Sequence, residues 1–201
     1  MLRTNFVAAL SLTAVLALAG SALAQQSQVV ESGETTVSLN AGFLQALTGL
    51  GVTAGVVAPT QLNGSTVNFP INGGAIDLAT AAGNIGHNGG LTLTAGGTVV
   101  AIENFTIDTT AKAPVITGLV ISNGTLVGRI NLFDLTLPKN FSLPLIQYRS
   151  VFVDINGVGV TLDSAAASAL NSAFNTNALK AGLWIGTARV RAFTNGWVPK
   201  M

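Results

Sequence analysis

The chain has 201 residues, with nine basic and eight acidic side chains, and it contains no cysteine. Only 8% of the residues are charged, so the sequence offers no basic surface of the kind that nucleic acids require. The lack of cysteine excludes disulfides, thiol catalysis and iron–sulfur clusters, so packing and β-sheet hydrogen bonds must stabilise the fold.

The first 24 residues predict a secretory signal peptide. Arg3 precedes an apolar run from Phe6 to Leu18, and the segment closes on the small-residue sequence Ala22-Leu23-Ala24. The apolar run is shorter than the about 20 residues that span a membrane. We therefore expect cleavage after Ala24 and a mature chain, residues 25–201, that forms one domain with no membrane span. Its predicted location is outside the cell, on the cell surface or in the periplasm.

Turn signals and alternating β-branched segments dominate the rest of the chain. Segments 65–71, 91–94, 98–107, 125–137, 151–155 and 158–162 have this pattern. In 125–137 the adjacent apolar pair Leu132-Phe133 interrupts the alternation and indicates a bulge. Asn-Gly, which favours tight hairpin turns, occurs six times, at 63–64, 72–73, 88–89, 123–124, 156–157 and 195–196.

Two segments predict short helices. "VSLNAGFLQAL" (37–47) and "VTLDSAAASAL" (160–170) share a strand-like start, a polar residue and an alanine- and leucine-rich continuation. Asn40 and Asp163 are the expected N-caps, because their side-chain oxygens can accept hydrogen bonds from free amides of the first turn. The fold predicted from these patterns is all-β, an antiparallel β-sandwich or barrel-like sandwich with one or two short helices.

The only histidine, His87, lies in the glycine-rich segment "GNIGHNGG". It has three interpretations: a turn residue whose ring bonds to a neighbouring strand, a group that serves a cofactor, or a catalytic base. Asp77 is close enough in the predicted topology to be its hydrogen-bond partner. The sequence has no Gly-x-Ser-x-Gly elbow and no metal-ligand spacing, so we predict neither an enzyme nor a metal site. A hydrolase with an unfamiliar site is the remaining alternative.

Residues 83–108, "GNIGHNGGLTLTAGGTVVAIENFTID", resemble the central hairpin of HtaA-type domains. These are secreted or surface-anchored bacterial β-sandwich modules associated with haem uptake. The likeness comprises the turn Gly86-His87-x-Gly89 and the alternating residues of two paired strands, and "FPINGGAID" and "GRINLFDLTL" take the places of further strands. The resemblance spans about residues 65–137.

The resemblance implies haem as a candidate cofactor. In haem-binding members a tyrosine near the start of the domain holds the iron, and the histidine of the turn supports that tyrosine. His87 matches the histidine, whereas the N-terminal segment offers Phe43 in place of the tyrosine, and the sole tyrosine is Tyr148. Iron ligation by His87 itself is the other possibility, with a cation near the propionates. The candidate cofactor-binding residues are His87, Tyr148 and Arg129, with Arg149 and Lys112 as further cations.

These observations predict a secreted, non-enzymatic ligand-binding module of HtaA-like type, with haem or another small apolar molecule as its ligand. The alternative is a structural or adhesive protein without a small-molecule ligand. In that case its neutral faces would contact the cell envelope or other copies of the chain.

Overall fold

The structure is a computed structural model that describes residues 27–197 except 112, 142, 144 and 148–149. The predicted signal peptide and three of the candidate haem-site residues, Tyr148, Arg149 and Lys112, lie outside the described residues. The described elements are, in chain order, β1 (Ser27–Leu39), α1 (Ala41–Gly49), β2 (Thr53–Val57), β3 (Gln61–Asn63), β4 (Thr66–Asp77), β5 (Gly83–His87), β6 (Gly90–Ala95), β7 (Thr98–Asp108), β8 (Val115–Ser122), β9 (Thr125–Thr136), β10 (Leu145–Gln147), β11 (Ser150–Leu162), α2 (Ser164–Ala173) and β12 (Trp184–Trp197).

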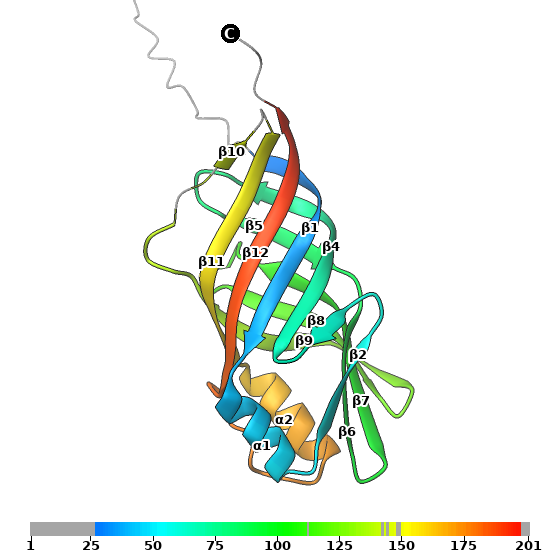
Figure 1. The fold of residues 1–201 in the computed structure, drawn as a ribbon. Coiled ribbons are helices and arrows are strands. Elements are labelled where there is room, and N and C mark those ends of the chain that lie inside the picture. The colour runs from blue at the N-terminus through cyan, green and yellow to red at the C-terminus, as the bar shows by residue number, and fades with distance from the viewer. Residues whose placement is uncertain (1–26, 112, 142, 144, 148–149, 198–201) are drawn as a thin grey trace, which may run out of the picture.

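The strands form one antiparallel sheet that folds into two layers (Figure 1). Strands β4, β1, β12 and β11 form one layer, and strands β5, β7, β8 and β9 cross behind it. Pairing of β7 with β8 closes the sheet, while β6 and β2 extend it beside β7. The predicted fold class, an antiparallel barrel-like sandwich with short helices, is confirmed.

Buried side chains of both layers meet in one continuous core. Phe69 of β4 and Phe105 of β7 pack edge to face with ring centroids 5.1 Å apart. Gly118 of β8 makes room for this contact, since a Cβ atom there would lie 2.9 Å from the Phe105 ring and 2.5 Å from Leu132. Neither described helix has the length and hydrophobicity needed to span a membrane.

The bulge predicted at Leu132-Phe133 is confirmed. Phe133 pairs with Ile116 and Asn131 pairs with Thr117, so Leu132 is the extra residue on β9. It points into the core, where 2% of its surface is exposed.

Three of the six Asn-Gly pairs connect strands, at 63–64, 88–89 and 123–124. The prediction of a turn was wrong for the pairs at 72–73, 156–157 and 195–196, which lie inside β4, β11 and β12. The ladder register shifts beside each of these three pairs. Gly73 and Gly157 have positive φ, and a glycine in this conformation supplies the local twist of a bulge as readily as that of a turn.

Both predicted helices and both N-caps are confirmed. Asn40 Oδ1 accepts hydrogen bonds from the amides of Gly42 (2.8 Å) and Phe43 (3.3 Å), and Asp163 Oδ1 accepts one from the amide of Ala165 (2.6 Å). Strands β1 and β11 flank β12 and are both antiparallel to it, so they end at the same edge of the sheet. The helices that follow these strands therefore lie together at one end of the molecule (Figure 1).

Candidate functional site

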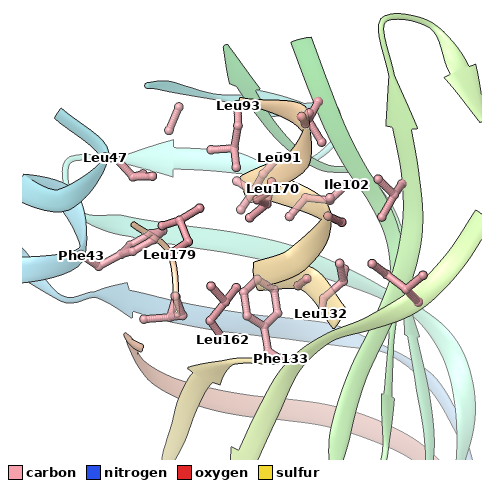
Figure 2. Close-up of a pocket in the computed structure, with 18 of the residues that line it drawn as sticks. Phe43, Leu47, Leu91, Leu93, Ile102, Leu132, Phe133, Leu162, Leu170 and Leu179 are labelled. Carbon is pink, nitrogen blue, oxygen red and sulfur yellow. The ribbon is translucent and has the colours of Figure 1, made fainter. Parts of the chain in front are cut away.

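A cavity of about 300 Å³ lies at the helical end of the molecule, between the two helices and the sheet. In Figure 2, Phe43 and Leu47 of α1, Leu170 of α2 and Leu179 surround it together with side chains of β6, β7 and β9. Among the described residues, none with a charged side chain lines it, and serines 122 and 172 are the only ones with a polar side chain that do. We call this cavity the helix-end pocket.

The helix-end pocket has a closed inner end and a mouth at the surface. Val67 and Leu132 at the inner end are 0% and 2% exposed, whereas Leu62 and Val127 on the same lining are 38% and 62% exposed. Leu62 belongs to β3, and Val127 lies near the start of β9. Exposed aliphatic side chains therefore form part of the mouth.

His87 does not line the helix-end pocket. It is the last residue of β5, only 2% of its surface is exposed, and its Nε2 is joined by a hydrogen bond of 2.7 Å to Oγ1 of the buried Thr35 on β1. A smaller cavity of about 40 Å³ touches both side chains. This inner cavity shares five wall residues with the helix-end pocket: Leu39, Val67, Leu91, Phe133 and Ile185.

Burial lowers the pKa of His87 from 6.5 to about 4, because the charged imidazolium would lose its hydration. Backbone groups of Phe105 and Ile85 oppose this shift in part, yet within the described residues Nδ1 has no well-oriented hydrogen-bond partner. The ring is therefore neutral near pH 7.

Asp77 is not the partner of His87, so the expected His–Asp hydrogen bond is wrong. The Asp77 carboxylate accepts hydrogen bonds from the Thr80 hydroxyl (2.7 Å) and from the amides of Ala79 and Thr80. These bonds, led by the Thr80 hydroxyl, hold the pKa of Asp77 below its ordinary value. Asp77 thus closes the turn after β4, while His87 pairs near the middle of that strand, opposite Ile71.

Arg129 lies on the outer face of the sheet. Its guanidinium donates hydrogen bonds to Oγ1 of Thr117 (3.1 Å) and to the carbonyl of Asn104 (2.9 Å). The next residue, Ile130, lines the helix-end pocket, and successive side chains of a strand point to opposite faces. The structure therefore does not bring Arg129 together with His87.

Comparison with solved structures identifies the fold. The C-terminal domain of HtaA from Corynebacterium glutamicum matches 84% of this chain and 99% of its own length, with a TM-score of 0.61 and 19% sequence identity. The N-terminal domain of HtaA from the same organism matches 82% of this chain and 97% of its own length, with a TM-score of 0.58 and 12% identity. The chain has an HtaA-like fold.

A third structure with this HtaA-like fold is the heme binding protein HtaB from Corynebacterium glutamicum. It has a TM-score of 0.53 and 11% identity, and it covers 84% of this chain and 96% of its own length. No family model matches the sequence, and a search of curated proteins finds no relative. The resemblance noted for residues 65–137 is confirmed at the level of the fold, and the HtaA-like fold extends well beyond that segment.

Sequence reasoning missed the helix-end pocket of this HtaA-like domain. The sequence of α2 contains a pattern that could have indicated the pocket. Ala166, Ala169 and Ala173 recur at positions i, i+3 and i+7 and therefore share one face of the helix. All three line the pocket. Small side chains on a helix face that covers a sheet leave space beneath the helix.

Proposed function

We propose that this protein is a non-enzymatic module that binds an apolar small molecule in the helix-end pocket. The observation that carries the proposal is a cavity of about 300 Å³ with an apolar lining and a mouth at the surface. Ligand sites in proteins have volumes of roughly 300–1,000 Å³ and mostly apolar walls. An apolar cavity of this kind is poorly hydrated when empty, so an apolar ligand gains both contacts and release from water.

A binding role is favoured over catalysis by the state of the polar residues. His87 is buried, neutral near pH 7 and bonded to a threonine, and Asp77 is held in a turn. Within the described residues, no three His, Cys, Asp or Glu side chains gather in a way that could hold a metal ion. The pocket walls carry methyl, methylene and aromatic groups, which position a ligand without reacting with it.

Haem is a candidate ligand because a heme binding protein, HtaB, has this fold. Haem iron needs an axial ligand such as His, Cys, Met or Tyr. The described lining of the helix-end pocket has none of these, and His87 lies behind it with Nε2 engaged by Thr35. Arg129 faces away from the pocket and cannot meet a propionate there. The described residues therefore do not fit haem in this pocket.

Nile red, an uncharged dye that fluoresces in apolar surroundings, tests the proposed function on the chain 25–201. We expect binding to wild type and about tenfold weaker binding to Ala169→Phe, because the added ring fills the pocket. Ala165→Phe is the matched control, since Ala165 lies exposed on the same helix and does not line the pocket. Equal binding by both variants would place the dye elsewhere and refute the proposal.

A haemin titration tests the haem hypothesis separately. From the lining we expect no shifted Soret band at stoichiometric haemin. A Soret band that weakens in His87→Ala would instead assign His87 to a haem site.

One observation favours the structural or adhesive alternative. Leu126 and Val127, beside the β8–β9 turn, are 61% and 62% exposed, and adjacent exposed apolar side chains can contact another copy of the chain or the cell envelope. Concentration-dependent assembly in sedimentation velocity, lost in Leu126→Ser, would support this role. In either role we propose that the protein acts outside the cytoplasm, after removal of residues 1–24.

A further inference from the structure

We infer that the ligand of the helix-end pocket is a flexible alkyl chain, as in a fatty acid or a membrane lipid, bound with its methyl end inward. This inference rests on the proposed function and specifies its ligand class.

The shape of the interior favours a slender ligand. The helix-end pocket, at about 300 Å³, adjoins the inner cavity of about 40 Å³ through the five shared wall residues. A rigid planar molecule would occupy only the wider part. A chain of methylene groups can change its torsion angles and continue past Leu91 and Phe133 into the narrow part.

The polarity of the walls orients such a chain. The inner walls are formed by Val67, Leu132 and Leu162, which are buried aliphatic side chains. The two polar lining side chains are nearer the surface: Ser172 is exposed on the last turn of α2, and Ser122 ends β8 beside the 123–124 turn. A polar head group therefore remains hydrated at the mouth, while the apolar end fills the interior.

The charges of the lining argue for the same ligand class. Because the described lining has no cationic side chain, it offers an acidic ligand no buried ion pair. Burying an unpaired carboxylate is strongly unfavourable. The carboxylate or phosphate of a lipid must then lie in solvent, and affinity comes from burial of the chain, at about 0.8 kcal/mol per methylene group.

The mouth of the pocket suits transfer of a chain from an apolar source. Leu62 and Val127 line it and are exposed. An alkyl chain leaving a bilayer would meet aliphatic side chains before it reached the interior. A free fatty acid would follow the same route, so the source is decided by experiment.

The test uses cis-parinaric acid, a fatty acid that fluoresces when its chain is buried, with the chain 25–201. We expect binding to wild type and to Ala165→Phe, and about tenfold weaker binding to Ala169→Phe. Octadecanoic acid should displace the probe, and haemin should not. Pyrene-labelled phosphatidylcholine in vesicles then distinguishes the sources: transfer of the label to the protein assigns a membrane lipid, and probe binding without transfer assigns free fatty acids.

A second variant tests entry of the chain into the inner cavity. Leu91 lines both cavities, so Leu91→Phe places a larger side chain where they adjoin. It should weaken octadecanoic acid more than octanoic acid, since only the longer chain extends past this point. Equal loss for both acids would overturn the inward path of the chain.

Failure of the inference is distinguishable from failure of the proposed function. If Nile red binding is sensitive to Ala169→Phe but parinaric acid does not bind, the pocket binds a ligand and the alkyl chain is wrong. If haemin displaces parinaric acid from the pocket, the preference for a slender chain is likewise overturned. If no probe is sensitive to Ala169→Phe, the proposed function fails as well.

Discussion

Folding removes the His87 ring almost completely from water. Its pKa falls from 6.5 to about 4 on folding, so the unfolded chain binds more protons between these values, and stability decreases as the pH falls through this window. At about 1.4 kcal/mol per pH unit, the full loss is on the order of 3 kcal/mol. Urea unfolding of wild type at a series of pH values from neutral to about 4 should show this decline.

His87→Gln provides the control, because glutamine can bond to Thr35 and does not titrate. We expect its stability to vary much less across the same window. Asp77, Asp108 and Asp154 have lowered pKa values, each chiefly through a side-chain hydrogen bond, so their contribution is lost only at more acidic pH. Equal pH slopes for wild type and His87→Gln would show that the ring is not desolvated.

At the scale of residues, the sequence indicates which face of a strand a side chain occupies better than it indicates which residue that side chain contacts. The alternation of Arg129 with Ile130 is sufficient to place Arg129 outside once Ile130 is taken as a core residue. The bond between Thr35 and His87 joins residues 52 positions apart, and only closure of the sheet brings them together. No local pattern could indicate that contact.

At the scale of elements, the N-cap of α2 allows a test of helix stability that does not alter a residue lining the pocket. We expect Asp163→Ala to be about 1 kcal/mol less stable than Asp163→Asn, because asparagine can cap the helix as aspartate does and alanine cannot. Ser168→Ala, at an exposed position of the same helix, should change the unfolding free energy by less than about 0.5 kcal/mol. Chemical unfolding followed by circular dichroism measures all three.

Asp163→Asn has a second readout at Asp134. Burial, and after it the neighbouring Asp163 carboxylate, raises the pKa of Asp134. Asparagine removes the negative charge, so the pKa of Asp134, followed by NMR, should fall toward its ordinary value. A pKa that stays unchanged would leave burial as its sole cause.

Strands and helices were predictable where one face is buried and the other wet. The alternation of 98–107 and 125–137 and the caps at 40 and 163 gave these elements nearly correct bounds. The bulges at 72–73 and 156–157 were not predictable, because Asn-Gly suits both a turn and a bulge. Whether the strand continues depends on the neighbouring strand, which the local sequence does not contain.

At the scale of the whole molecule, the ends of the fold are held together. Strand β1 pairs with β4 on one edge and with β12 on the other, so the first and last described strands are neighbours within one layer. Removing either strand would open the closed sheet and expose its core on both sides of the gap. The chain is therefore expected to fold as one cooperative unit, and the pocket at the helical end to depend on closure of the entire sheet.

The predicted cleavage after Ala24 is compatible with this arrangement, because β1 begins at Ser27. We expect a bacterial host that expresses the full chain to export a product whose mass is that of a chain beginning at Gln25.

That product should unfold in a single calorimetric transition, with equal calorimetric and van't Hoff enthalpies. A chain ending before Trp184 lacks β12 and should not fold. A product that keeps residues 1–24 would refute the export prediction, and two separate transitions would refute the single unit.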